Sequence, residues 1–118
     1  NRGVRFGAST YVARTLLAAR ERDADLRFAL NCRYDDAVAD ALSTLDAPVG
    51  TFDSAGASAA SPASVEQGVE AAFEVTGETP GAVVDRGAYG DEPIAYLLAP
   101  DADALVDRTV AVLDALGE

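Results

Sequence analysis

The sequence has no histidine, methionine, tryptophan or lysine among its 118 residues, and it has a single cysteine. Without histidine it lacks the commonest general base and the commonest metal ligand. One cysteine forms neither an internal disulfide nor a thiolate zinc cage. These absences exclude histidine-based catalytic triads, zinc fingers and histidine-ligated zinc enzymes.

Positive charge is also scarce. Nine basic residues, all arginines, stand against twenty acidic residues, which gives a net charge of -11 and a pI near 4.2. A surface of this charge repels phosphate backbones, so we expect this chain itself not to bind nucleic acid. A lysine-free acidic composition is typical of salt-accumulating halophiles, in which molar salt shortens the Debye length to about 3 Å and screens the self-repulsion. We therefore expect stability to rise with salt.

Long hydrophobic runs are absent as well. No apolar segment approaches the length of a membrane span, and no basic start precedes a hydrophobic signal segment. We therefore expect a cytoplasmic protein without membrane contact. Because the chain opens with Asn1 and has no methionine, we expect residues 1–118 to be one domain excised from a longer polypeptide, with a length that supports a single core.

Hydrophobic periodicity predicts helices interspersed with strands. Apolar residues three and four apart indicate helices, and short apolar or alternating runs between turn residues indicate strands. Ser64 with Gln67 forms a capping box, Gly77 is a stop signal, and Asp101 is an N-cap. The predicted helices cover 8–22, 34–45, 64–76 and a last segment from 102 onward; the predicted strands cover 26–32, 48–52, 82–85 and 93–99; residues 53–62 are predicted to be a loop.

This order of elements predicts an α/β domain with three layers, α/β/α, around a small sheet. Residues 86–92 are too few for a helical crossover between the last two strands, so these strands are expected to be antiparallel neighbours. The sheet is then mixed.

The segment Asp85–Pro93 is the most informative candidate site, because it packs two glycines, four charges and a proline between two apolar strands. Gly87 and Gly90 permit close approach of the backbone to an anion, and Arg86 supplies a fork of donors. The segment therefore predicts a phosphate cradle. The alternative is a hairpin loop whose charges are solvated and whose glycines serve only the turn.

The segment Asn31–Tyr34 is a second candidate. It runs from a predicted strand end into a predicted helix start, where α/β sheets usually bind ligands, so Asn31 and Arg33 would point at the crevice. The alternative is that Arg33 pairs with Asp36 or Asp40 of its own helix.

Other polar residues are weaker candidates. Ser9 and Arg14 belong to the first predicted helix, where Arg14 could reach a bound anion, although an arginine in such a place is more often solvated. Cys32 is expected to be a small buried hydrophobe rather than a nucleophile. The aspartates of the last helix are interpreted as capping and charged surface rather than as a magnesium site: they are Asp101, Asp103 and Asp107.

Four short segments occur in a characteristic order over nearly the whole chain: Gly7-Ala8-Ser9 with Val12-Ala13-Arg14, Asn31-Cys32-Arg33-Tyr34, Asp85-Arg86-Gly87, and Gly90-Asp91-Glu92-Pro93. Together they resemble the archaeal ThiN-type thiamine-phosphate synthase family. The resemblance implies a three-layer α/β/α fold similar to the class II aldolase N-terminal type. In that family the domain follows a hydroxymethylpyrimidine phosphate kinase, where it joins pyrimidine and thiazole units, or a helix-turn-helix in archaeal regulators.

The sequence departs from the synthase pattern in three ways. Asp91 stands where the family usually has lysine, Ser54 stands where arginine is common, and the histidine expected toward the C-terminal end is absent. A synthase must stabilise a departing pyrophosphate with several positive groups or magnesium, whereas a sensor only pairs one phosphate. The residues that remain therefore favour binding over turnover.

The resemblance thus predicts a sensing domain of an archaeal transcription regulator. It would be a non-catalytic homodimer that binds thiamine phosphate or a related phosphorylated thiamine intermediate, uses no cofactor or metal, and contacts DNA only through an upstream helix-turn-helix domain. The alternatives are a synthase domain that joins hydroxymethylpyrimidine diphosphate to thiazole phosphate with magnesium, and a dimerisation module without a pocket. Arg33 and Arg86 are the expected phosphate partners within a predicted ligand-binding set of Asn31, Arg33, Tyr34, Asp85, Arg86, Gly87, Gly90, Glu92, Ser9 and Arg14.

Overall fold

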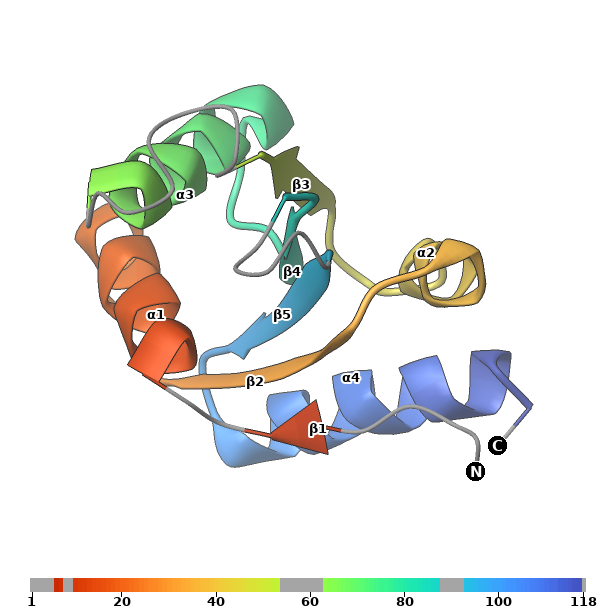
Figure 1. The fold of residues 1–118 in the computed structure, drawn as a ribbon. Helices are drawn as coiled ribbons and strands as arrows, with labels where there is room; N and C mark the ends of the chain where they lie inside the picture. Colours follow the sequence, from red (N-terminus) through yellow and green to blue (C-terminus); the bar gives the residue numbers. More distant parts are fainter. Residues whose placement is uncertain (1–5, 8–9, 54–62, 88–92, 118) are drawn as a thin grey trace.

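The computed structural model describes residues 6–7, 10–53, 63–87 and 93–117, which contain four helices and five strands (Figure 1). The helices are α1 (Thr10–Arg22), α2 (Asp36–Leu42), α3 (Ala63–Thr76) and α4 (Ala102–Ala115). The strands are β1 (Phe6–Gly7), β2 (Phe28–Arg33), β3 (Val49–Phe52), β4 (Ala82–Asp85) and β5 (Ile94–Ala99).

Each predicted helix and strand is present, with ends that differ by a few residues. The largest difference is α2, which is shorter than the predicted 34–45 because Asp35 lies in extended backbone as the N-cap, and its Oδ1 accepts a hydrogen bond from the backbone N of Val38 at 2.9 Å. Asp101 caps α4 in the same way, as predicted, accepting from Ala104 at 2.7 Å. The predicted cap Ser64 is wrong in position, because α3 already begins at Ala63.

The strands form a mixed sheet in the order β1-β2-β5-β4-β3. The neighbouring strands β4 and β5 are antiparallel, as predicted, and β2 pairs with β5 antiparallel on the other side. The strands β3 and β4 are parallel, because α3 carries the chain across one face of the sheet between them.

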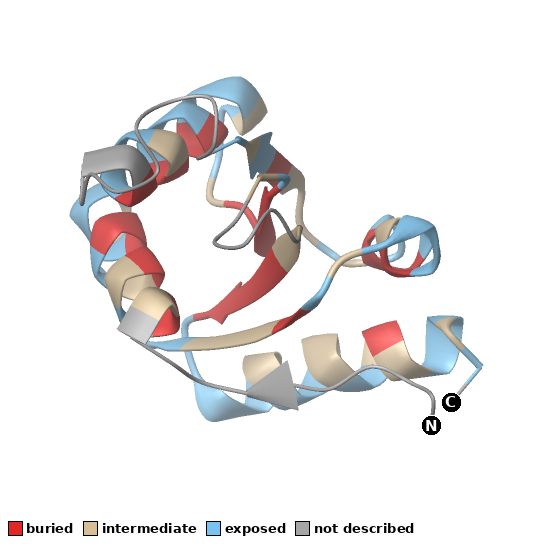
Figure 2. Cartoon of the chain, viewed as in Figure 1, coloured by how far each residue is buried: buried red, intermediate tan, exposed pale blue. Residues whose placement is uncertain are grey.

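Two helices cover each face of the sheet, which confirms the three-layer α/β/α fold. Figure 1 shows α1 and α3 side by side on one face and α2 with α4 on the other. Buried residues lie on the inner sides of the helices and along the central strands (Figure 2). The cluster under α1 and α3 contains Val12, Ala18, Ala19, Leu26, Val65, Val69, Ala72, Phe73, Val83, Tyr96 and Leu98. The cluster under α2 and α4 contains Cys32, Val38, Ala41, Leu42, Ala82, Val84, Ala95, Leu97 and Val112.

The last helix does not bury all of its apolar residues. Val112 is fully buried against the sheet, whereas Val106 is 57% and Val110 47% exposed. Among the described residues, no helix combines the length and apolarity that crossing a bilayer requires.

Candidate functional site at the carboxyl edge of the sheet

The carboxyl ends of β2, β3 and β4 lie at one end of the sheet. Ile94, the first residue of β5, pairs with Arg33 on one side and with Asp85 on the other, and Asp85 pairs with Phe52 of β3. These four residues therefore form one row across four strands, which we call the carboxyl-edge row. Ligands of α/β proteins usually bind beyond the carboxyl ends of the strands, and this row marks that edge here.

The carboxyl-edge row lies on the face covered by α1 and α3. Paired residues of neighbouring strands project to the same side of a sheet, and both Ile94 and Phe52 pack against the cluster under these helices. Asn31 pairs with Tyr96, which is buried in the same cluster. The predicted residue Asn31 therefore lies on this face too, two residues further from the edge.

The two expected phosphate partners follow strands that end at this edge. The Arg33 side chain is 61% exposed, and its Nε lies 3.6 Å from Oδ2 of Asp35. Arg86 is exposed directly after β4, and its backbone N donates a hydrogen bond to the last residue of β3 at 2.8 Å. The ion pair of Arg33 is thus with Asp35 rather than with Asp36 or Asp40, because Asp35 precedes the helix, close to the strand end.

Asp85 has a structural part in the predicted phosphate cradle. It is 4% exposed, and its Oδ1 accepts a hydrogen bond from the backbone N of Gly87 at 3.0 Å. An aspartate that accepts from the amide two residues later stabilises a turn, so Asp85 shapes the chain after β4. Three other predicted residues, Gly90, Glu92 and Ser9, lie outside the described residues.

Tyr34 lies on the opposite face from Asn31. Its backbone N donates a hydrogen bond to the carbonyl oxygen of Pro93 at 3.2 Å, which extends the pairing of β2 with β5 beyond the carboxyl-edge row. Its side chain packs against the cluster under α2 and α4. The fold therefore places Tyr34 on the other face of the sheet from Asn31 and Arg33, with which it was predicted to bind the ligand.

Tyr96 is a buried polar residue of this face that the sequence pattern did not single out. It is 5% exposed, and burial together with the negative charge of Asp85 raises its pKa to about 12, against the opposing effects of the Thr15 hydroxyl and Arg14. The phenol is therefore a neutral hydrogen-bond donor near pH 7. In the sequence, Tyr96 lies within the apolar run 94–99, and the hydroxyl of this one residue is the only feature of the run that indicates a polar role.

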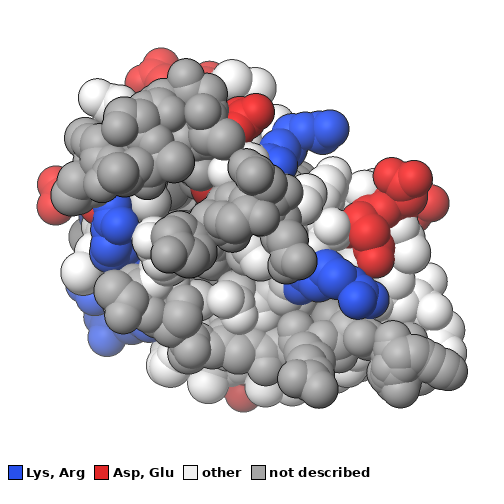
Figure 3. All heavy atoms as spheres, in the orientation of Figure 1, with Lys and Arg blue, Asp and Glu red and all other residues white. Residues whose placement is uncertain are grey.

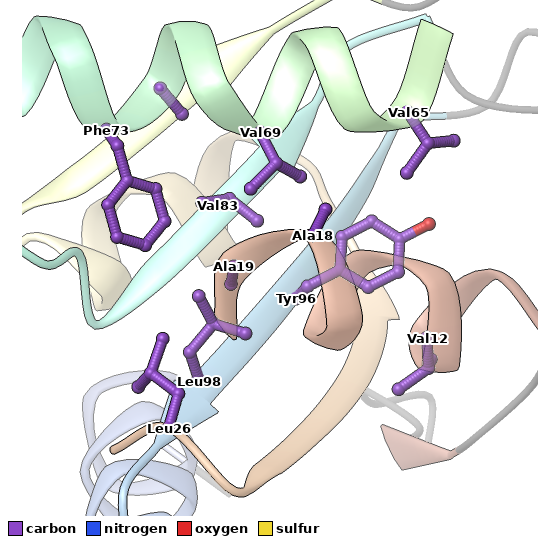
Figure 4. Close-up of a cluster of buried hydrophobic side chains, with 11 residues drawn as sticks. Val12, Ala18, Ala19, Leu26, Val65, Val69, Phe73, Val83, Tyr96 and Leu98 are labelled. Carbon is purple, nitrogen blue, oxygen red and sulfur yellow. The ribbon is translucent and has the colours of Figure 1, made fainter. Parts of the chain in front are cut away.

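Thr15 of α1 is the neighbour of Tyr96 in the helix layer. It is 1% exposed, and its Oγ1 makes no hydrogen bond of normal geometry within the described part of the chain. The Thr15 hydroxyl nevertheless lies near enough to the Tyr96 hydroxyl to lower the pKa of Tyr96. Figure 4 shows the Tyr96 ring between α1 and α3, with its hydroxyl directed toward the helix ends that carry Val12 and Val65. Polar atoms therefore interrupt the apolar core close to the carboxyl edge.

The N-terminal end of α3 lies at the carboxyl edge. Gly68 lies against the ring of Phe52, and a Cβ at this glycine would be 2.1 Å from Cδ2 of the ring. One turn later, Ala72 lies over Gly50, two residues before Phe52 in β3. The helix therefore runs antiparallel to β3 and begins where the strand ends, so its positive dipole end is directed at the edge.

The helix α1 runs beside α3 in the same direction. Two ion pairs between the helices show this, because their members are eight residues apart in both helices and follow the same order. Arg14 Nη2 lies 3.3 Å from Oε1 of Glu66, and Arg22 Nη2 lies 3.1 Å from Oε2 of Glu74. The guanidinium of Arg14 also stacks on the ring of Tyr11, 5.5 Å from its centroid. The predicted anion partner Arg14 is therefore at the carboxyl edge, held by contacts within the helix layer.

The charges around the molecule are dispersed. Figure 3 shows arginines in separate groups on the side of the molecule in view, with acidic groups beside some of them and no continuous basic patch among the described residues.

Cys32 is 3% exposed, and burial raises the pKa of its thiol to about 11, which confirms the expected buried hydrophobe. In the described ranges, no group of three acidic, cysteine or histidine side chains is placed to hold a metal ion.

Comparison with known proteins identifies the family. The family model described as "Thiamine-phosphate synthase ThiN" matches residues 1–111. The chain is 27% identical over 112 residues to "Thiamine-phosphate synthase ThiN" of Methanothermobacter thermautotrophicus, covering 92% of this chain and 59% of that protein. It is 29% identical over 109 residues to "Bifunctional thiamine biosynthesis protein ThiDN" of Methanocaldococcus jannaschii, covering 92% of this chain and 26% of that protein.

Two solved structures have the same fold. The C-terminal domain of protein MJ0236 aligns with a TM-score of 0.77 at 26% identity, over 92% of this chain and 59% of that one. The C-terminal domain of a phosphomethylpyrimidine kinase aligns with a TM-score of 0.79 at 20% identity, over 89% of this chain and 61% of that one.

The fold and the family match define an α/β domain related to thiamine-phosphate synthases. The chain belongs to the ThiN family. It spans about three-fifths of the length of the first of the curated relatives and about a quarter of the second.

Proposed function

We propose that this chain binds thiamine phosphate, or a closely related phosphorylated thiamine intermediate, beyond the carboxyl-edge row. The observation that carries the proposal is the alignment of Arg33 and Asp85 on either side of Ile94. This alignment brings the ends of two segments that are 52 residues apart in the sequence to one edge of the sheet. Arg33 and Arg86 are then available to the phosphate from opposite sides of β5. Asn31, half-buried on the same face, is available to the rings, whereas buried Asp85 shapes the chain that carries Arg86.

The surroundings of this edge support binding of an anion. The first turns of α1 and α3 are both directed at it, and helix N-termini favour negative charge. Arg33 and Arg86 are exposed, so they can reorient toward a ligand without first leaving a buried contact. Charge-assisted guanidinium–phosphate bonds are stronger than the exposed ion pair that Arg33 makes with Asp35.

We further propose that the chain senses the ligand rather than forming it. A departing pyrophosphate has to be stabilised by several cations or by magnesium, but Asp91 and Ser54 stand at two positions where the family pattern has a cation. In this proposal the domain is part of a dimeric, DNA-binding regulator of a halophilic archaeon, and ligand binding favours one of its arrangements. A helix-turn-helix domain encoded directly upstream would support this role.

The second candidate is a synthase domain, which the names of the curated relatives favour. In that case the chain, with magnesium, forms thiamine phosphate from hydroxymethylpyrimidine diphosphate and thiazole phosphate. Incubating the chain with both precursors and magnesium, and detecting product by mass spectrometry, separates the candidates. Product formed at many turnovers per chain would overturn the sensing proposal, and a kinase domain encoded upstream would weigh against it.

Isothermal titration calorimetry of the chain with thiamine phosphate tests binding itself. We expect Arg33→Gln and Arg86→Gln each to weaken binding by about 10- to 100-fold, which corresponds to about 1.5–3 kcal/mol for a hydrogen bond to a charged group. The matched control is Arg27→Gln, which changes an exposed arginine beside the opposite end of β2. An absence of heat at several salt concentrations would overturn the proposal, as would equal weakening by the control.

A further inference from the structure

Two ion pairs between α1 and α3 repeat the same chemistry at opposite ends of the helices. Arg14 pairs with Glu66 at 3.3 Å, and Arg22, eight residues later, pairs with Glu74, also eight residues later, at 3.1 Å. Each arginine also lies on an aromatic ring, at centroid distances of 5.5 and 5.6 Å. The pairs therefore share this chemistry but differ in their position relative to the sheet, and Arg22 also donates a hydrogen bond to the carbonyl oxygen of Glu70 at 3.3 Å.

Their positions differ because α3 runs antiparallel to β3. Glu66 lies in the first turn of α3, two residues before Gly68, which contacts Phe52 of the carboxyl-edge row. Glu74 lies in the last turn, beyond Ala72, which contacts Gly50 further from the edge. The pair of Arg14 with Glu66 is thus at the carboxyl edge, and the second pair is at the far end.

The charge of Arg14 also acts on the buried polar group beneath the helices. Arg14 and Asp85 both lie near enough to the Tyr96 hydroxyl to affect its pKa in opposite directions. Arg14 and Asp85 thus act on the same buried hydroxyl, and Asp85 directly precedes Arg86 in the chain. A phosphate held by Arg86 would interact with the field of Arg14 as well.

We propose that Glu66 is a positioning residue that limits the affinity of the carboxyl edge for phosphate groups, by holding Arg14 in an ion pair which a phosphate or diphosphate has to displace. The inference rests on the proposed function. The Arg14 side chain is 26% exposed and that of Glu66 48%, so the pair is partly solvated and contributes little to folding. A phosphate oxyanion forms a stronger, bidentate contact with a guanidinium and can replace the carboxylate.

The test compares Glu66→Gln with Glu74→Gln, using inorganic pyrophosphate as the probe, at low ionic strength and with and without magnesium. We expect Glu66→Gln to tighten pyrophosphate binding about two- to five-fold, the range that loss of one exposed charge pair produces. Glu74→Gln should leave the affinity unchanged. Arg14→Gln should remove the gain when combined with Glu66→Gln, and Glu66→Asp should restore a value close to that of the original chain.

A second ligand separates this role from a general structural one. Thiamine without phosphate should not bind Glu66→Gln more tightly than the original chain, because it has no oxyanion for Arg14 and its thiazolium cation gains nothing from the loss of a carboxylate. Equal pyrophosphate affinity in Glu66→Gln and the original chain, or a gain for thiamine as large as that for pyrophosphate, would overturn the inference. If the original chain does not bind thiamine phosphate, but Glu66→Gln still binds pyrophosphate more tightly than the original chain does, the proposed function alone would be overturned.

Discussion

Gly50 in β3 lies directly beneath Ala72 in α3, at a distance that leaves no room for a side chain on the strand. A Cβ at Gly50 would be 2.7 Å from Cβ of Ala72 and 3.0 Å from its carbonyl oxygen. Because the carbonyl belongs to the helix backbone, rotation of a side chain cannot relieve the clash. The close contact fixes the height of α3 above the sheet, and with it the position of the helix end at the carboxyl edge.

We expect Gly50→Ala to destabilise the fold by about 1–3 kcal/mol, because α3 has to move away from β3 to accept the added methyl group. Urea unfolding followed by circular dichroism measures the change. In the Ala72→Gly background the same substitution should cost less, because one of the two clashing groups is gone, although the carbonyl remains. Equal costs in both backgrounds would show that this contact is not the cause.

Gly77 ends α3 by a backbone effect alone. Its φ is +72°, and a Cβ there would have no atom within 4 Å, so the cost of a side chain comes only from the left-handed conformation. We expect Gly77→Ala to lower stability by about 1–2 kcal/mol. Asparagine tolerates this conformation better, so Gly77→Asn should be milder in the same thermal or urea unfolding measurement. An alanine variant as stable as the original would contradict this account.

Tyr96 links stability to high pH. Its pKa rises from the ordinary 10 to about 12 in the folded chain, mainly because burial disfavours the phenolate. Between pH 10 and pH 12 the Tyr96 phenol is deprotonated in the unfolded chain but still protonated in the folded chain. The stability that the neutral phenol contributes is therefore fully present below pH 10 and is lost as pH rises to 12. Two pKa units correspond to about 2.7 kcal/mol.

Urea unfolding of the original chain and of Tyr96→Phe across pH 9 to 12 tests this linkage. The variant should lose less stability over this interval, since its ring has no proton to release. Parallel curves for the original chain and Tyr96→Phe would contradict the prediction.

Arg108 joins α4 to β5 and to the segment between α2 and β3 through two contacts of unequal burial. Its Nη1 donates a hydrogen bond to the carbonyl oxygen of Leu98, and its Nε lies 3.2 Å from Oδ1 of Asp46. The arginine side chain is 14% exposed and that of Asp46 is 77% exposed. We expect Arg108→Met to cost about 1–3 kcal/mol because it leaves the Leu98 carbonyl without this donor, and Asp46→Asn to cost at most about 1 kcal/mol. Chemical unfolding of both variants measures the difference, and a larger loss for Asp46→Asn would contradict this division.

Much of the local structure can be predicted from the sequence. The cap at Asp101 and the stop at Gly77 are correct because each depends on hydrogen bonds or dihedral angles within a few residues. The second helix is predicted too long because the apolar period continues past both of its ends, whereas Asp35 caps it from extended backbone. In α4, Val112 faces the sheet, whereas the apolar residues Val106 and Val110, four residues apart, face outward.

The candidate site is predictable only in part. Asn31, Arg33 and Asp85 stand out because polar residues at strand ends are unusual in apolar surroundings, and the fold brings them to one face. Tyr96 could not be recognised, because its raised pKa comes first from burial and then from Asp85 of the neighbouring strand, and both arise only in the fold. The same holds for Glu66, whose partner Arg14 is 52 residues away.

The sequence by itself determined the kinds and the order of the elements from α1 to α4, although not the short strand β1, and the acidic, arginine-only charge, because periodicity, caps and composition are local or additive properties. Only the tertiary structure decided that β5 lies between β2 and β4, that α1 and α3 begin at the same edge, and which carboxylates pair with Arg14 and Arg33. These relationships depend on strand pairing and helix packing between segments distant in the chain. The free energy of such contacts comes from close packing and hydrogen bonding in three dimensions, and no short stretch of sequence encodes it.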